Sequence, residues 1–71
     1  MHRRELAQRS ADGLEVSLLW DPIDDYLSVR VVDTRADETF EVPVGNAKPL
    51  DVFEHPFGYL ARYEAALLAA A

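Results

Sequence analysis

The two histidines are the residues of this 71-residue chain best suited to acid–base chemistry or metal binding near neutral pH. His55 has Glu54 beside it, and Asp51 and Tyr59 lie four residues away on either side. These neighbours make His55 a candidate ligand for a metal ion or a small molecule, whereas His2 lies near the beginning of the chain. A metal site needs a second strong ligand at a defined spacing, such as another histidine four residues away, and His55 has none. The sequence therefore favours a structural histidine, with a ligand site at His55 and Glu54 as the alternative.

Two other groups of side chains raise the question of chemistry. Asp21, Asp24 and Asp25 are carboxylates in one predicted turn, but the glycine and the terminal glutamate of a calcium-binding loop are missing. Aspartates in turns usually accept hydrogen bonds from the local backbone, which is the favoured interpretation. Ser28 could be combined with a histidine and an aspartate, yet nothing around it resembles a nucleophile turn. We therefore expect no catalytic residue, no metal site, no cofactor and no enzymatic activity.

The balance of charges argues against nucleic acid as a partner. The chain has 7 basic and 13 acidic residues and a formal net charge of −6, whereas affinity for a phosphate backbone depends on lysine and arginine. Arg3, Arg4 and Arg9 fall near the N-terminus and are interpreted as solvated tail charges. Hydrophobic residues make up 49% of the chain, which is too many for a disordered protein. The absence of cysteine excludes disulfides and thiolate metal sites.

Residues 1–13 are predicted to be a flexible tail that ends in the turn sequence SADG, with only Leu6 and Ala7 as apolar residues in its middle. The basic residues of this tail are not followed by an apolar run, so it does not resemble a signal peptide. The longest apolar run, AALLAAA, is too short to cross a bilayer. A cytoplasmic location without membrane contact is the default expectation.

Three segments alternate between apolar and polar residues with the period of two that is typical of half-buried strands. The apolar positions are Leu14, Val16, Leu18 and Trp20 in the first segment, Leu27, Val29 and Val31 in the second, and Phe40, Val42 and Val44 in the third. The turn sequences DPID and DTRADE separate the segments, and Pro22 suits a type I turn. Such short connections predict a three-stranded antiparallel meander with one apolar face.

Placing all the apolar positions on one face also predicts the register of the strands. The predicted opposite pairs are Leu18 with Leu27, Val16 with Val29, and Val29 with Val42. The same register places Arg30 between Glu15 and Glu41 on the polar face, as expected of paired charges on neighbouring strands. The second strand is then central, and Pro43 falls on an edge strand, where its missing N–H is tolerated.

Two prolines, Pro49 and Pro56, mark the beginnings of predicted helices, because proline is accepted in the first helical turn. A short helical turn over residues 49–54 and a longer helix from residue 56 onward are expected, with one helix kinked at Pro56 as the alternative. The longer helix has an apolar stripe that is expected to cover the apolar face of the sheet, with His55 at the joint. The stripe consists of Phe57, Leu60, Ala61, Leu67, Leu68 and Ala71, and Phe53 continues it.

The longer helix has a second, mildly apolar face for which the sheet offers no cover. Tyr59, Tyr63, Ala66 and Ala70 form this face at helical spacing. A helix that is apolar nearly all round is normally buried on more than one side. The sequence therefore predicts contact with another protein, most simply a second copy related by a two-fold axis. An alanine-rich helix end that frays is the alternative.

Two further expectations concern single positions. Leu19 should lie beside Tyr26 on the polar face of the sheet and form a small apolar patch there, which is a second candidate interface. Glu64 lies within or beside the apolar stripe of the longer helix. Its carboxylate is expected to reach solvent or Lys48, because burying an unpaired carboxylate is costly.

The pattern LEVSLLWDPIDDYLSVRVVD, followed by an aromatic–valine strand and PLDVFEHPFGYLA, resembles small actinobacterial proteins of unassigned function. The similarity covers residues 14–61, and the preference for Ala, Arg, Asp, Val and Leu suits the high-GC genomes of that group. The resemblance implies no activity and carries over no catalytic residues.

These patterns predict an α+β fold in which residues 14–71 form one βββα domain after a tail of residues 1–13. The expected function is that of a non-enzymatic interaction or structural module. It would act as a homodimer formed through the C-terminal helix or as an accessory to an unidentified protein partner. The alternative is a small-ligand or metal-binding regulatory protein that uses the region of His55.

Overall fold

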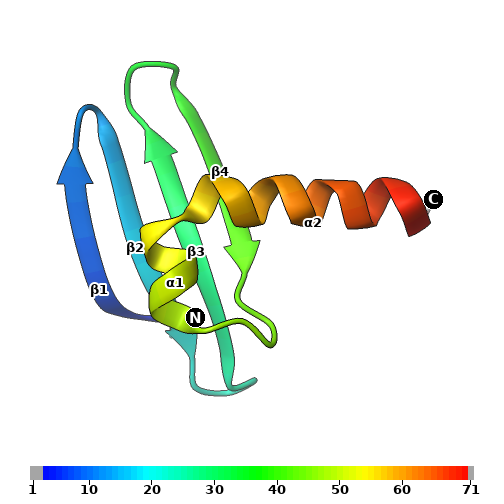
Figure 1. Ribbon diagram of the computed structural model, residues 1–71. Coiled ribbons are helices and arrows are strands. Elements are labelled where there is room, and N and C mark those ends of the chain that lie inside the picture. Colours follow the sequence, from blue (N-terminus) through cyan, green and yellow to red (C-terminus); the bar gives the residue numbers. More distant parts are fainter. Residues whose placement is uncertain (1–2, 71) are drawn as a thin grey trace.

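The computed structural model describes residues 3–70, with their side chains except that of Ala70. In this range the elements are β1 (Arg4–Ala11), β2 (Leu14–Asp21), β3 (Tyr26–Asp33), β4 (Glu38–Pro43), α1 (Pro49–Glu54) and α2 (Pro56–Ala70). The strands form one antiparallel sheet in the order β1-β2-β3-β4 (Figure 1). The α+β class, the meander and the two helical pieces are confirmed, whereas the predicted number of three strands is wrong.

The additional strand is β1, which forms from residues that the sequence predicts to belong to the tail. Its hairpin with β2 turns at Asp12 and Gly13, whose φ angles of 53° and 81° are both positive. A two-residue type I′ turn requires two positive φ angles, and Asp-Gly is one of its preferred sequences. Most of β1 is exposed and only Ala7 is half-buried, so β1 lacks the apolar alternation of the other strands. The Asp-Gly pair is therefore the sequence signal for this strand.

The register of the sheet agrees with the prediction between β3 and β4 and differs by two residues between β2 and β3. Leu18 lies opposite Val29 instead of Leu27. The predicted register makes Asp25 a strand residue opposite Trp20, with DPID as the four-residue loop, and strand geometry needs a negative φ. The observed loop has four residues, and Asp25 takes the positive φ, at 49°. A shift of two residues keeps every side chain on its predicted face.

The polar face of the sheet carries a row of charges that differs in part from the prediction. Arg30 lies opposite Glu41 as expected, with 3.4 Å between Nε and Oε1. Glu15, predicted on the other side of Arg30, lies opposite Val32 because of the shifted register. Glu41 also accepts two hydrogen bonds of 2.8 Å from the guanidinium of Arg3.

The core lies between the other face of the sheet and α1. Val52 of α1 is fully buried, with 0% of its surface exposed. The remaining buried core side chains are those of Val16, Leu18, Val29, Val31, Val42 and Val44. Figure 1 shows α1 lying over β2 and β3, while α2 leaves the body of the protein past β4. The short helix therefore provides most of the cover for the sheet.

The prediction that the long helix covers the sheet is thus wrong for most of its length. Only the beginning of α2 reaches the sheet, where Phe57 packs on Phe40 with 5.4 Å between ring centroids and Leu60 is half-buried. The chain leaves helical geometry at His55, with φ −131° and ψ 53°, and α2 begins in a new direction. Pro56 has no N–H to donate and opposes a continuous helix at this point. The two pieces are therefore separate helices.

Candidate functional site

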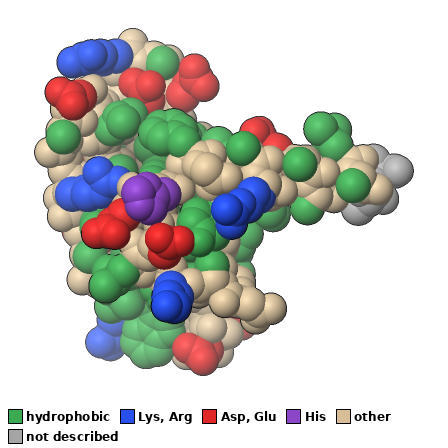
Figure 2. All heavy atoms as spheres, viewed as in Figure 1, with side chains coloured by type: hydrophobic (Ala, Val, Ile, Leu, Met, Phe, Trp, Pro, Cys, Tyr) green, Lys and Arg blue, Asp and Glu red, His purple; other side chains and the backbone are tan. Residues whose placement is uncertain are grey.

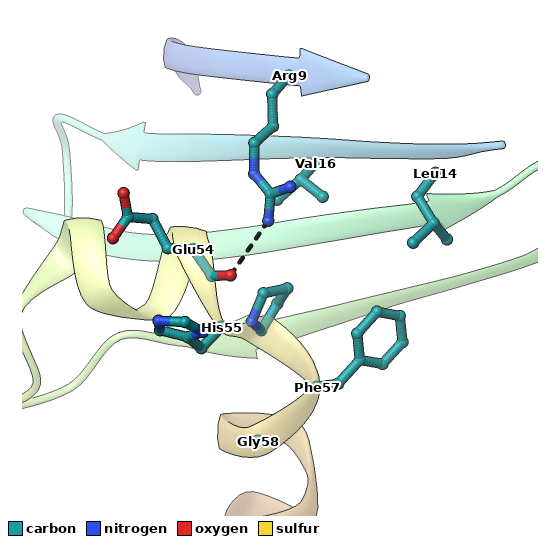
Figure 3. Close-up of a pocket in the computed structure, with 8 residues that line it drawn as sticks. Arg9, Leu14, Val16, Glu54, His55, Phe57 and Gly58 are labelled. Carbon is teal, nitrogen blue, oxygen red and sulfur yellow. Dashed lines mark hydrogen bonds between the residues drawn. The ribbon is translucent and has the colours of Figure 1, made fainter. Parts of the chain in front are cut away.

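His55 follows α1 and has an exposed side chain. Its backbone N–H donates to the carbonyl oxygen of Asp51 at 2.9 Å, which closes the last turn of the helix. Figure 3 shows the imidazole and the carboxylate of Glu54 directed away from Leu14 and Phe57. Within residues 3–70, no group of three His, Cys, Asp or Glu residues is arranged to hold a metal ion. The observed contact of His55 is therefore that of a residue that ends helix α1.

The other two candidate ligands near His55 are bonded to each other. The hydroxyl of Tyr59 donates to Oδ2 of Asp51, and this hydrogen bond raises the pKa of Tyr59. The guanidinium of Arg62 lies 4.9 Å from the centre of the Tyr59 ring, within the range of a cation–π contact. These contacts join the two helices, so Asp51 and Tyr59 help to fix the corner between α1 and α2.

The contacts of two turn aspartates and the position of Ser28 indicate structural roles. Asp21 accepts a hydrogen bond of 3.0 Å from the backbone N–H of Ile23, and Asp25 accepts one of 2.9 Å from the indole N–H of Trp20. Ser28 is 1% exposed, and its Oγ has no hydrogen-bond partner among the residues that are described. Its position inside β3 is not the strand-to-helix turn that presents a catalytic serine.

The second half of α2 stands apart from the rest of the molecule. We call residues 61–69 the arm, and every residue of the arm is exposed. Figure 2 shows hydrophobic side chains along the arm on the face in view. Leu67 is 54% exposed and Leu68 is 77% exposed. In the described part of the chain, no helix has the length and hydrophobicity that crossing a membrane requires.

The predicted interface on α2 is only partly available. Tyr63 and Ala66 lie on the arm and are exposed, while Tyr59 is half-buried at the helix corner. The side chain of Ala70 lies outside the described residues. Both leucines of the arm, which the sequence places on the sheet, are exposed as well, so the arm offers solvent two apolar faces.

The leucine face of the arm includes one charged residue. Glu64 is exposed, as predicted, and lines a shallow groove with Leu67 and Leu68. Residues three and four positions apart are neighbours on the surface of a helix. The leucine face therefore presents two large apolar side chains and one carboxylate together.

The second predicted interface, on the polar face of the sheet, is not an exposed patch. Leu19 is 7% exposed and lies opposite Ser28. Tyr26 is 46% exposed and lies opposite Asp21. The prediction of Leu19 beside Tyr26 is wrong because it depends on the register that differs by two residues between β2 and β3.

A hollow lies where the corner between α1 and α2 meets β1 and β2 (Figure 3). We call it the corner hollow; its volume is about 470 Å³ and its lining is mostly apolar. It is lined by Arg9, Leu14, Val16, Glu54, His55, Pro56, Phe57 and Gly58. The hollow thus combines apolar walls with one guanidinium.

Arg9, which the sequence predicts to be a solvated tail charge, instead reaches from β1 to the end of α1. Its Nη2 donates to the carbonyl oxygens of Phe53 at 2.9 Å and of Glu54 at 3.3 Å, and its guanidinium lies 5.4 Å from the centre of the Phe53 ring. A positive charge at a helix C-terminus is favourable because it neutralises unpaired carbonyls. The Asp-Gly hairpin was the available signal, since it pairs Arg9 with Val16 on the core face.

The charges of the molecule are unevenly distributed. Within α2 only Arg62 and Glu64 are charged, so this helix has no net charge. The entire net charge of −6 therefore belongs to the remainder of the chain. The arm is a projection without net charge from an acidic body.

No family model, no curated protein and no solved structure matches the chain. The arm and the corner hollow are therefore the features on which a function can be based.

Proposed function

We propose that the chain is a non-enzymatic protein-interaction module that self-associates through α2. The observation that carries this proposal is the exposure of the arm, including 77% of Leu68. Isolated helices shorter than about 12–15 residues are only marginally stable in water, and the arm has nine residues. An apolar cover from a second molecule would bury the leucines and stabilise the helix.

The distribution of charge supports a contact between copies through this helix. Two acidic bodies repel each other, and the repulsion decreases with their separation. Contact through α2, which has no net charge, brings apolar surfaces together while the sheets stay apart. The acidic body also favours a protein over nucleic acid as the partner. We propose a cytoplasmic location, since a fold without cysteine does not depend on an oxidising compartment.

The edges of the sheet are poorer routes to self-association. The pairing of β1 is irregular between Glu5 and Ala7, and such a bulge opposes the addition of a further strand. β4 has six residues and ends at Pro43, which has no N–H for a further ladder. Both edges thus have features that discourage pairing, whereas the arm has none.

Sedimentation equilibrium between about 10 micromolar and about 1 millimolar tests the proposal. We expect a monomer–dimer equilibrium for the native chain. The variant Leu67→Glu/Leu68→Glu should remain monomeric and folded, because both side chains are exposed in one chain. Leu50→Glu is the control, since Leu50 is an exposed leucine on α1 and should leave the dimer intact. A native chain that is monomeric at the highest concentration would overturn the proposal.

The corner hollow supports a second candidate function, the binding of a small ligand or metal ion beside His55 and Glu54. Apolar walls with a few polar groups are typical of ligand sites. NMR spectra recorded during titration with zinc, nickel and calcium ions test the metal form of this function. Shifts confined to the lining residues would support it, and unchanged spectra would remove it.

A further inference from the structure

We infer that the arm of each copy seats in the corner hollow of the other, so that two chains exchange arms around a two-fold axis. Leu67 and Leu68 fill the apolar part of the hollow, and Glu64 forms an ion pair with the partner's Arg9. This arrangement rests on the proposed self-association and adds to it the site, the contacts and the orientation of the two chains.

The arm presents the required side chains on one face. Phe57, Ala61, Glu64 and Leu68 follow one another at spacings of four, three and four residues, which places them along one side of α2. Phe57 lines the corner hollow, and Leu68 lies near the far end of the arm. One continuous face therefore runs from the hollow of a chain to the tip of its own arm.

The hollow complements this face in both hydrophobicity and charge. Leu14, Val16 and Phe57 contribute apolar walls. The hydrogen bonds of Arg9 within the described residues use Nη2 alone, which leaves Nη1 available to a carboxylate. Figure 3 shows the carboxylate of Glu54 turned away from Leu14 and Phe57, so it does not occupy the apolar part of the hollow. Two leucines and a glutamate match these walls and this guanidinium.

Distances along α2 allow both arms to seat at the same time. Phe57 and Glu64 are seven residues apart, which is about 10 Å along a helix. Two antiparallel α2 helices that cross midway, near Ala61, bring each Glu64 to the partner's Phe57 and carry its leucines over the hollow. The small Ala61 permits a close approach, and a Cβ added at Gly58 would meet no atom within 4 Å. The contact is reciprocal, so it closes as a dimer and does not propagate.

An arm that binds in the partner's corner hollow also buries more surface than two arms that contact only each other. The nine-residue arm is about 14 Å long and about 10 Å wide. Two arms that touch only each other bury much less than the roughly 800 Å² per partner of a standard stable interface. A hollow of about 470 Å³ with walls from β1, β2 and the helix corner adds contacts on both sides of the dimer.

Disulfide trapping tests the exchange without background, because the chain has no cysteine. In Leu14→Cys/Leu68→Cys, oxidation should link the two positions between chains and give a covalent dimer on a non-reducing gel. The control Leu14→Cys/Ala66→Cys shares the substitution in the hollow but places the second thiol on the opposite side of the arm. We expect at least about fivefold less covalent dimer for the control, because a disulfide forms only over a short Cα–Cα separation.

The result separates the exchange of arms from self-association itself. If the native chain sediments as a dimer but the two cysteine pairs cross-link equally, the exchange is overturned and self-association stands. Efficient linking by Leu68→Cys alone would place the arms tip to tip and would overturn it in the same way. A monomeric native chain overturns both.

The proposed ion pair between Glu64 and the partner's Arg9 is tested by the dimer dissociation constant. Glu64→Gln should raise the dimer dissociation constant roughly two- to thirtyfold, because the symmetric dimer loses two partly exposed ion pairs. Asp24→Asn makes the same change of charge in the exposed turn between β2 and β3, at the other end of β2 from Leu14, and should leave the constant unchanged. Equal constants for Glu64→Gln and the native chain would overturn the pairing of Glu64 with Arg9.

Discussion

At the scale of single residues, Arg9 joins parts of the chain that are far apart in the sequence. It extends from the edge strand β1, donates to the carbonyl oxygens of Phe53 and Glu54, and stacks on the ring of Phe53. These contacts hold the end of α1 against the sheet. Because Arg9 also lines the corner hollow, one side chain connects the packing of the helix with the shape of the candidate site.

Replacing Arg9 should therefore destabilise the fold. We expect Arg9→Ala to lower the free energy of unfolding by about 1 kcal/mol, through lost hydrogen bonds to the helix end and a lost cation–π contact. Arg9→Lys keeps the charge and should lose roughly half as much. The control is Arg4→Ala, an exposed arginine of the same strand, which should change stability by less than about 0.5 kcal/mol. Urea denaturation at low protein concentration measures all three, and equal losses for Arg9→Ala and Arg4→Ala would contradict this role.

The ion pairs of Glu41 predict a dependence of stability on pH. Hydrogen bonds from Arg3, and then from Arg30, lower the pKa of Glu41 below its usual value of 4.5. A lowered pKa in the folded state stabilises the protein above pH 4.5, and this contribution is lost as the pH falls through the folded-state pKa. The effect should stay below about 1 kcal/mol, because a carboxylate that is partly exposed is screened by solvent.

Unfolding free energies measured from about pH 6 to about pH 3 test this dependence. Glu41→Gln should lose less stability than the native chain as the pH falls. Glu38→Gln, on the same strand, should follow the native chain. Parallel curves for the native chain and Glu41→Gln would show that the ion pairs of Glu41 do not contribute.

The structural roles of these arginines could not be predicted from local sequence patterns. Arg3 and Arg9 bind partners 38 and 44 residues away, so no spacing in the sequence reveals the pairs. The turn aspartates were predictable, because Asp21 accepts a hydrogen bond from the N–H two residues ahead. Residue roles were thus predictable where the partner is a near neighbour in the chain.

At the scale of elements, the cover of the sheet comes mainly from α1, whereas the sequence predicts that the longer helix, α2, covers it. α1 covers the sheet with Val52, while every residue of the arm of α2 is exposed. Pro56 separates the two, and the direction that α2 takes depends on packing at the corner. The apolar stripe predicts burial against the sheet, but Leu67 and Leu68 are exposed, because periodicity does not tell which surface covers a helix.

Removal of the arm should leave the body folded. A variant that ends at Leu60 is expected to keep the unfolding transition of the sheet within about 1 kcal/mol of the full chain at low concentration, because the arm residues are exposed. Its circular dichroism should lose helical signal, and it should be monomeric. A variant that fails to fold would show that the arm packs on its own chain.

The strands show the same limits of sequence reasoning. Alternation identifies β2, β3 and β4 and their faces, because each has one buried and one polar side. β1 lacks this alternation because it is an exposed edge strand. Only the Asp-Gly turn that follows it indicates a strand at this position. The register between β2 and β3 places Asp25 in the turn with a positive φ, a backbone conformation that the hydrophobic pattern alone does not reveal.

At the scale of the whole molecule, an acidic body carries an arm that has no net charge and two apolar faces. The body buries its own core, so we expect it to fold without the arm. In the proposed dimer, the corner hollow of a second copy covers the exposed arm beside Arg9. In the proposed dimer, helices of no net charge lie between two bodies that each carry the net charge of −6.

Hydrogen exchange of the arm amides, compared at about 10 micromolar and about 1 millimolar chain, tests the central claim most directly. A short helix without cover exchanges quickly, whereas a helix held between two chains is protected. We predict that protection of residues 62–69 rises strongly with concentration, while that of β2 and β3 changes far less. Arm protection that is the same at both concentrations would contradict self-association through α2.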